Sequence, residues 1–305
     1  MMSHNPDVVG TSRTTGQPGT HVIDHGGPNE APLLVLLHGF GGSALNWQLV
    51  GPALAERYRV VAVDLYAHGR SVAPKKLDSG SVVSQISAVI DAESVSNPRP
   101  VILVAGSFGA AMAFLLARER PEAVGAIVAV DGAIPVHPDR RLDLTMTFKR
   151  WLISVPGVAG LIFRKTSSMT PRQYVDRQLT QAGVDPDAVD AQLMRASIEL
   201  EEARHHDRAA HDSQQRLLRD LLRIFAKGRP FSRMTAAVDV PVLWLHSETD
   251  PLIPFDLARN FVAAHPGWEL SSRTGLGHVP MVVDPDWVAE EILSWLGPSR
   301  RPGAG

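Results

Sequence analysis

The chain has 305 residues, of which 44% are hydrophobic and 20% charged, and its formal net charge is -2. This length can bury a large core, and the near-neutral charge gives no reason to expect nucleic acid or an acidic membrane surface as a partner. The chain contains no cysteine, which excludes disulfides and thiolate metal sites.

The first 20 residues are polar and include no apolar stretch of signal-peptide length. We therefore expect a flexible segment over residues 1–20 and, with no membrane span in the sequence, a cytoplasmic protein. An antiparallel edge hairpin is expected around Val8 and Val22. Apolar runs of strand length lie near 33–37, 59–63, 100–105, 125–131, 240–246 and 268–272. Helical patterns alternate with these runs, which predicts an α/β fold with a doubly wound, mostly parallel sheet.

The run at 33–37 opens into a glycine-rich loop that starts with His38 and contains Phe40. Such a loop can hold a phosphate, but no Gly-Lys-Ser/Thr follows and the spacing is not that of a dinucleotide site. It can also direct backbone N–H groups toward an oxyanion, and Phe40 is the candidate donor. We expect His38 to fix this loop rather than act as a base. In the turn after the next strand, His68 and Ser71 are assigned structural roles.

Ser107 lies between an apolar run and a helix-forming run predicted over 108–120. A strand that leads directly into a helix must turn sharply, and the residues two positions away must be small, as Ala105 and Gly109 are. The backbone N–H of Phe108 is a second candidate donor to an oxyanion. An ordinary polar residue in such a turn gives the same short pattern, so the function of Ser107 depends on partners elsewhere in the chain.

Strand patterns disappear for about a hundred residues after Asp131, and helical spacing replaces them. We interpret residues 134–237 as an inserted helical cap. Within it, the apolar side chains of Trp151, Leu161 and Phe163 are candidates for a substrate pocket, although packing within the cap is the more common explanation of such a run. A leucine-rich helical stripe near residue 217 is expected to be core packing.

Several histidines and aspartates gather inside the cap, over residues 205–212. His206 and His211 are five positions apart, which does not place them on one helix face as four would. We expect a solvated polar face there and no metal site.

A serine nucleophile needs a base and an acid that orients the base. Asp250 follows the strand run at 240–246 and begins an Asp-x-x-x-Pro turn, which makes it the candidate acid. His278 has a glycine on either side and is the candidate base. Asp131, at the end of an earlier strand, is the competing acid. The glycine- and proline-rich end, residues 298–305, is expected to be a disordered tail.

Together these motifs resemble the α/β-hydrolase superfamily, in the branch that carries a helical cap. The order serine, acid, histidine is the order in that family. The resemblance implies a core of residues 21–133 and 238–297. Ala105 departs from the usual Gly-x-Ser-x-Gly, and a serine at 107 argues against the epoxide-hydrolase and dehalogenase branches, which have aspartate there.

The resemblance implies a serine hydrolase, carboxylesterase or lipase-like, that cleaves an ester-like carbonyl in a small apolar acyl substrate and needs no cofactor. Three enzyme classes with the same triad remain open: a thioesterase or acyltransferase, a perhydrolase, and a carbon-carbon bond hydrolase. The last often has a tryptophan after the histidine, where this chain has Val279. A non-catalytic small-molecule receptor is the alternative from another class.

Overall fold

The computed structural model describes residues 9–134, 168–226, 235 and 237–297. In the described chain, eight strands form one sheet in the order β1-β2-β4-β3-β5-β6-β7-β8. The strands are β1 (Thr11–Thr14), β2 (His21–Gly26), β3 (Leu33–Leu37), β4 (Arg59–Val63), β5 (Val101–Gly106), β6 (Val124–Val130), β7 (Val242–Ser247) and β8 (Trp268–Arg273). β2 is antiparallel to its neighbours β1 and β4, and every other pair is parallel. The predicted mostly parallel sheet is confirmed.

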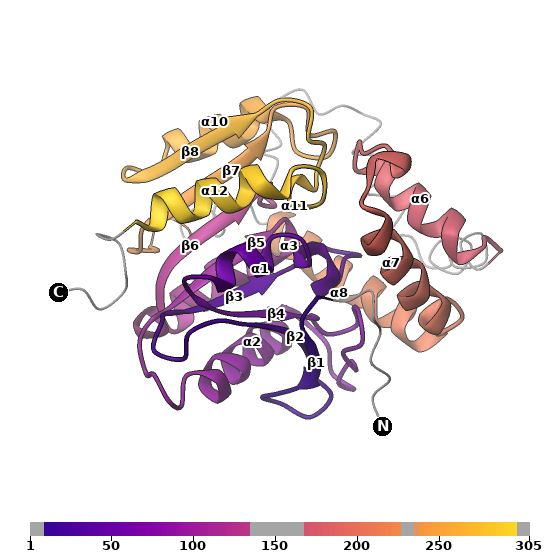
Figure 1. Cartoon of the computed structure of the whole chain (residues 1–305), viewed down its shortest axis with the longest axis horizontal. Coiled ribbons are helices and arrows are strands. Elements are labelled where there is room, and N and C mark those ends of the chain that lie inside the picture. Colours follow the sequence, from indigo (N-terminus) through magenta and orange to yellow (C-terminus); the bar gives the residue numbers. More distant parts are fainter. Residues whose placement is uncertain (1–8, 135–167, 227–234, 236, 298–305) are drawn as a thin grey trace.

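Helices cover both faces of the sheet (Figure 1). They are η1 (Ala44–Trp47), α1 (Gly51–Ala55), α2 (Ser79–Glu93), α3 (Phe108–Glu119), η2 (Pro121–Ala123), α6 (Pro171–Gln181), η3 (Pro186–Ala188), α7 (Ala191–Arg204), α8 (Arg208–Ala226), α10 (Phe255–Ala263), α11 (Pro280–Val283) and α12 (Pro285–Leu296). In β3, Val35 and Leu37 join one buried cluster with α2, α3 and α10, while Leu34 and Leu36 join another with α1, α11 and α12. Burial on both faces explains why the strand sequences are continuously apolar.

Residues 11–14 form β1, so the flexible segment predicted over 1–20 does not extend to them. The Arg13 guanidinium bridges Asp24 on β2, at 2.8 Å, and Glu93 at the end of α2, at 2.7 Å. These ion pairs hold a polar edge strand that has little apolar surface to bury. The expected edge hairpin is present between β1 and β2, while Val8 lies outside the described residues.

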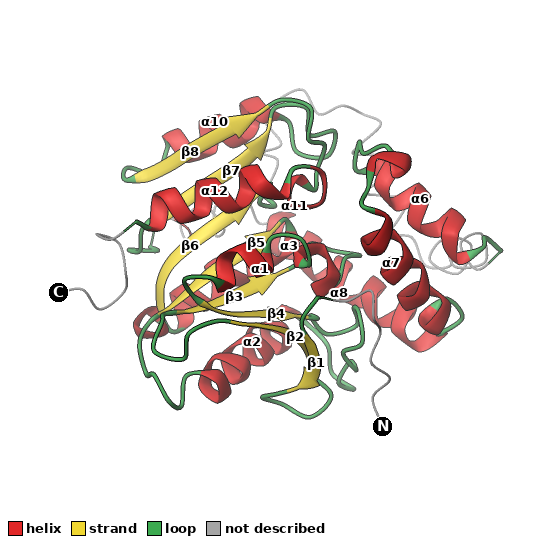
Figure 2. Cartoon of the chain, viewed as in Figure 1, coloured by secondary structure: helices red, strands yellow, loops and turns green. Residues whose placement is uncertain are grey.

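The described part of the stretch between β6 and β7 contains helices and no strand. Leu217, Leu221 and Phe225 of α8 are buried in the cluster that contains α2, in agreement with core packing. Figure 2 shows the parallel strands pointing toward the side where α6 and α7 lie. The carboxyl ends of the strands therefore face the segment that the sequence predicts to be a cap. The candidates Trp151, Leu161 and Phe163 lie outside the described residues.

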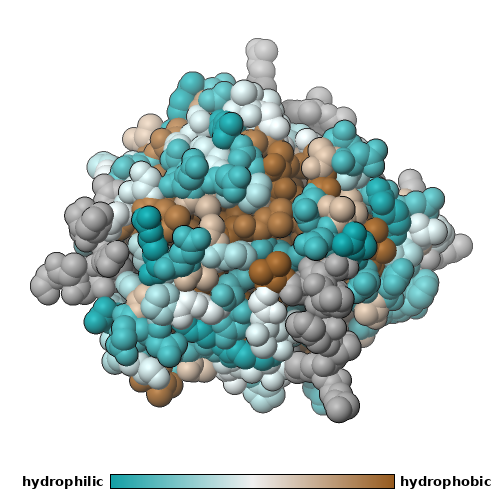
Figure 3. Space-filling model, viewed as in Figure 1, coloured by the Kyte–Doolittle hydropathy of each residue, from teal (hydrophilic) through white to brown (hydrophobic). Residues whose placement is uncertain are grey.

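The surface seen in Figure 3 is mostly hydrophilic, with a hydrophobic area near its middle, around α11. α11 begins at Pro280, two residues after His278. Among the described helices, none combines the length and the apolar character needed to cross a bilayer.

Gly109 allows α3 to pack directly against the end of β3. A Cβ atom at this position would lie 2.7 Å from the His38 carbonyl oxygen and 2.8 Å from that of Leu37. We expect Gly109→Ala to lower the free energy of unfolding by about 1–3 kcal/mol, since rigid backbone must move. Urea denaturation measures this change.

Gly80→Ala is the matched control, because a Cβ atom there would find its nearest neighbour at 3.5 Å, on the exposed first turn of α2. It should leave the stability nearly unchanged. Equal, small effects of both substitutions would show that β3 and α3 do not need the close approach.

Candidate active site

Ser107 alone connects β5 to α3, and its backbone has a positive φ of 43° with ψ of -110°. A non-glycine residue in this region is strained, and such strain persists only where the surroundings fix it. Here the Ser107 N–H donates to the Val130 carbonyl at 3.0 Å, and the Ser107 carbonyl accepts from Ala133 at 3.1 Å. Ala105 is fully buried in β5. Alanine at this position is therefore compatible with the turn.

The three side chains predicted to act together meet at the carboxyl ends of the strands. His278 Nε2 lies 2.9 Å from Ser107 Oγ, and His278 Nδ1 lies 2.7 Å from Asp250 Oδ2. They come from the turn after β5, the loop after β7 and the loop after β8. In this arrangement the serine hydroxyl donates to Nε2, while Nδ1–H donates to the carboxylate.

The Asp250 carboxylate is buried and oriented by its own turn. Its Oδ1 atom accepts hydrogen bonds from the N–H groups of Leu252, at 2.7 Å, and Ile253, at 3.0 Å. This leaves Oδ2 directed at His278. The Asp-x-x-x-Pro turn seen in the sequence thus fixes the direction of the carboxylate.

The glycine-rich loop after β3 lies against Ser107. A Cβ atom at Gly39 would be only 3.1 Å from the Ser107 Cβ. The backbone N–H groups of Phe40 and Phe108 have no acceptor in the part of the chain that the structure describes. The N–H of Phe108 is the first of α3, where the helix dipole favours negative charge. Both candidate donors are thus available beside the serine.

His38 and Asp64 hold the glycine-rich loop in place. His38 Nδ1–H donates to the Gly39 carbonyl at 2.7 Å, and its Nε2 accepts from the Leu65 N–H at 3.0 Å. Burial lowers the pKa of His38, which keeps it neutral, as expected of a loop-fixing residue. Asp64 Oδ1 accepts from the Ala44 N–H at 2.7 Å. The sequence analysis did not single out Asp64, although its place at the end of β4 was the available signal.

Ser71 and His68, the other two residues with expected structural roles, are also buried and contact neighbouring groups. Ser71 Oγ accepts from the His21 N–H at 2.8 Å. The His68 ring lies near Phe40 and Phe108, with centroids 5.1 Å and 6.4 Å away. Burial places the pKa of His68 well below its ordinary value.

The segment after α6 touches the histidine loop directly. The Ala182 carbonyl accepts a hydrogen bond from the His278 N–H at 2.7 Å. Gly277, with a φ of 62°, permits this approach, since a Cβ atom there would lie 2.5 Å from the same oxygen. Sequence analysis did not find this contact, because a backbone carbonyl leaves no residue-type signature.

Asp131, the competing acid, is fully buried and has a positive φ of 44°. One oxygen or nitrogen atom from each of Asp131, Asp250 and His278 lies within 4.8 Å of the other two. Asp131 Oδ1 accepts from the Ser247 N–H at 2.8 Å and lies 3.1 Å from His246 Nδ1. Asp131 therefore lies close to Asp250, the predicted acid, but is not hydrogen-bonded to His278.

The hydrogen bonds of His246 determine where its proton lies. The Trp244 indole N–H, which can only donate, points at Nδ1 from 3.3 Å, and Nε2 faces the Ile253 carbonyl, which can only accept, at 3.0 Å. Nδ1 is therefore an acceptor, and Nε2 is the protonated nitrogen. Burial and the charge of Asp250 raise the pKa of Asp131 well above its ordinary value, while burial lowers that of His246.

Within the described residues, Asp131, Asp250 and His278 are the group whose ligand-type atoms approach closely enough to suggest a metal. Hydrogen bonds account for this proximity without an ion. His205, His206 and His211 do not form such a group, and the absence of a metal site there stays a prediction.

Comparisons with known proteins agree on the fold and differ in the reaction. A model of the alpha/beta hydrolase family matches residues 34–291. The protein named "Putative carbamate hydrolase RutD" of Klebsiella pneumoniae (strain 342) is 27% identical over 256 residues, covering 84% of this chain and 88% of that protein.

Two solved structures resemble the chain over most of its length. Haloalkane dehalogenase DbeA of Bradyrhizobium elkani USDA94 has a TM-score of 0.74 at 20% identity, covering 94% of this chain and 96% of that one. The 2-hydroxy-6-oxo-6-phenylhexa-2,4-dienoate hydrolase of Rhodococcus sp. strain RHA1 has a TM-score of 0.68 at 21% identity, covering 90% and 93%. Their names describe different reactions, so these likenesses show the fold alone.

The raised pKa of Asp131 should make stability depend on pH. Between the ordinary aspartate pKa of 3.8 and the raised value in the folded protein, the unfolded chain binds fewer protons, so wild-type stability falls as the pH rises. Asp131→Asn removes this titration. Its free energy of unfolding, relative to wild type, should rise by up to about 1.4 kcal/mol per pH unit above pH 4.

Urea denaturation of both proteins at pH 4.5, 6 and 7.5 measures this trend. Asp286→Asn is the control, because Asp286 is exposed on the first turn of α12 and should show no trend. A pH-independent difference for Asp131→Asn would mean that Asp131 is ionised in the folded protein.

Proposed function

Because this chain belongs to the alpha/beta hydrolase family, we propose that it is a serine hydrolase that cleaves an ester-like carbonyl through a covalent acyl-enzyme. The observation that carries the proposal is the continuous hydrogen-bonded sequence from Ser107 Oγ through His278 to Asp250. A serine, a histidine and a buried aspartate joined in this order activate the hydroxyl as a nucleophile.

In the proposed mechanism, Ser107 Oγ attacks the carbonyl carbon while His278 Nε2 takes the hydroxyl proton. Asp250 holds the imidazole in the tautomer with Nδ1–H and stabilises the imidazolium that forms. The N–H groups of Phe40 and Phe108 bind the tetrahedral oxyanion, each contributing about 3 kcal/mol by analogy with other acyl-transfer sites. His278 then returns its proton to the leaving group, and water hydrolyses the acyl-enzyme.

The fixed and neutral surroundings of the triad support this mechanism. Burial keeps His38 neutral, and the raised pKa of Asp131 favours its neutral form, which leaves Asp250 as the carboxylate that faces His278. The relative from Klebsiella is named for carbamate, which also presents a carbonyl carbon to a nucleophile. Val279 lacks the aromatic ring that the carbon-carbon bond hydrolases often carry there, so ester-like substrates are preferred.

Removal of the nucleophile tests the proposal most directly. Ser107→Ala should lower kcat for a short-chain ester by about four orders of magnitude or more, leaving only the contributions of binding and the oxyanion donors. The variant should also lose labelling by a fluorophosphonate. Ser84→Ala, which removes an exposed serine of α2, should keep both activity and labelling. Full turnover in Ser107→Ala would rule out the serine mechanism, and absence of labelling in wild type would favour a receptor.

The two carboxylates should differ in their effect on turnover. Asp250→Asn should lower kcat by about three to four orders of magnitude, because the useful tautomer of His278 is no longer favoured. Asp131→Asn replaces a protonated acid by a neutral group and should lower kcat by less than about tenfold. Steady-state kinetics of both variants at one pH measure the contrast, and the reverse order would make Asp131 the acid.

A further inference from the structure

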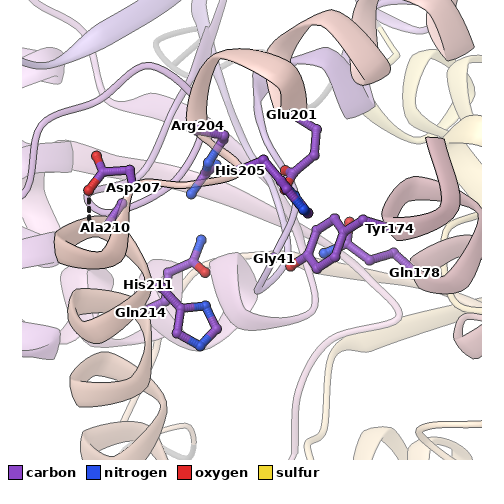
Figure 4. Close-up of a pocket in the computed structure, with 10 residues that line it drawn as sticks. All are labelled: Gly41, Tyr174, Gln178, Glu201, Arg204, His205, Asp207, Ala210, His211 and Gln214. Carbon is purple, nitrogen blue, oxygen red and sulfur yellow. Dashed lines mark hydrogen bonds and ion pairs between the residues drawn. The ribbon is translucent and has the colours of Figure 1, made fainter. Parts of the chain in front are cut away.

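A polar pocket lies between the glycine-rich loop and helices α6, α7 and α8 (Figure 4). Gly41 forms one wall. The polar side chains that line the pocket include Tyr174, Gln178, Arg204, His205 and Gln214. The pocket has a volume of about 30 Å³, above the roughly 10–15 Å³ that holds one ordered water. It thus has room for a small polar group rather than a long apolar chain.

Arg204, at the end of α7, supplies a positive charge to this pocket. Its Nη2 donates to the Ala67 carbonyl at 3.0 Å, and no carboxylate in the described chain forms an ion pair with it. Arg13 and Arg59, by contrast, each pair with aspartate and glutamate. A guanidinium has five N–H donors, so a half-buried Arg204 with one bond retains donors for an anion.

His205 points an unpartnered atom at the same pocket. Its side chain is 3% exposed, Nδ1 lies 2.8 Å from Glu201 Oε1, and Nε2 has no partner among the described residues. The Tyr174 ring packs edge-on against His205, with centroids 5.7 Å apart. Burial raises the pKa of Tyr174, so its hydroxyl stays neutral and able to donate. Because Nδ1–H donates to the Glu201 carboxylate, Nε2 of the neutral ring is an acceptor, and a water or hydroxyl that accompanies a ligand could donate to it.

The two carboxylates at the pocket wall are already engaged. Glu201 bonds to His205, and Asp207 Oδ1 accepts from the Ala210 N–H at 2.9 Å at the start of α8, the contact dashed in Figure 4. Gln214 Nε2 shares the Ala67 carbonyl with Arg204. Arg204 is therefore the charged group in the pocket with donors still free.

The pocket is close to the serine. Gly39 lies against Ser107, and Gly41 is two residues further along the same loop. Two residues of chain span at most about 7 Å. The pocket wall at Gly41 is therefore within about 7 Å of the glycine that packs against Ser107.

We propose that the pocket at Arg204 binds a carboxylate at the far end of the acyl group, so that the preferred substrates are monoesters of short dicarboxylic acids. This inference rests on the proposed hydrolase function. It replaces the apolar acyl group expected from the sequence by an anionic one, because Arg204 retains N–H donors that a carboxylate can accept.

Ethyl hydrogen succinate and ethyl butyrate test the proposal, since they match in length and differ at one end by a carboxylate in place of a methyl group. In wild type, kcat/KM measured by proton release should be at least tenfold higher for ethyl hydrogen succinate. Arg204→Gln should lower that value at least tenfold, mainly through KM, and leave ethyl butyrate within about threefold. Arg204→Lys should keep part of the preference, because it keeps the charge.

Arg219→Gln is the matched control, because Arg219 is an exposed arginine of α8 whose Nε bonds only to the Gln215 carbonyl. This variant should leave kcat/KM unchanged for both esters. Equal losses of kcat/KM for both esters in Arg204→Gln would overturn the proposal. The role of Arg204 would then be to attach α7 to the core through its hydrogen bond to the Ala67 carbonyl. A wild type that prefers ethyl butyrate would also overturn it.

Binding separates this proposal from the hydrolase proposal. Titration calorimetry of ethyl hydrogen succinate into Ser107→Ala should show binding that is lost in the Ser107→Ala, Arg204→Gln double variant. Such binding without turnover of any ester in wild type would support the pocket and contradict the hydrolase. Ester turnover with no binding difference between the two variants would contradict the pocket alone.

Discussion

The candidate active site depends on one strained residue, Ser107, which turns the chain from β5 into α3 in a single step. Its backbone is held by hydrogen bonds to Val130 and Ala133, and Gly109 and Gly39 allow the close packing around it. The same turn places Oγ beyond the sheet edge and makes the Phe108 N–H the first of a helix. One local constraint thus supplies both a nucleophile and a positive electrostatic environment beside it.

Near this turn, the protonation of His246 and of two aspartates depends on neighbours that can only donate or only accept a hydrogen bond. The Trp244 indole N–H and the Ile253 carbonyl define the neutral tautomer of His246, and burial beside Asp250 raises the pKa of Asp131, which favours its neutral form. Two buried carboxylates can therefore lie close together with one negative charge between them. Asp250, which receives two backbone N–H groups, is the carboxylate that carries the charge.

Much of the fold and the triad could be predicted because the sequence signals are local. Buried parallel strands are continuous apolar runs, and those at β3 and β4 were located to the residue. Ser107, Asp250 and His278 each stand among the turn residues that their geometry requires. The first strand of the edge hairpin was expected around Val8 and lies at Thr11–Thr14, because this segment is polar and is held by ion pairs that include the distant Glu93. The proton on Asp131 and the pocket at Arg204 depend on tertiary neighbours, which spacing along the chain does not reveal.

The hydrogen bond from His278 to the Ala182 carbonyl has an evolutionary consequence. A carbonyl oxygen is the same for every amino acid, so substitution at position 182 preserves this contact while the backbone path is preserved. Insertions and deletions between α6 and η3, by contrast, displace the oxygen and with it the histidine loop. We therefore expect selection to act on the length of this connection rather than on its amino-acid composition. The helices around it can then change in sequence without loss of the contact.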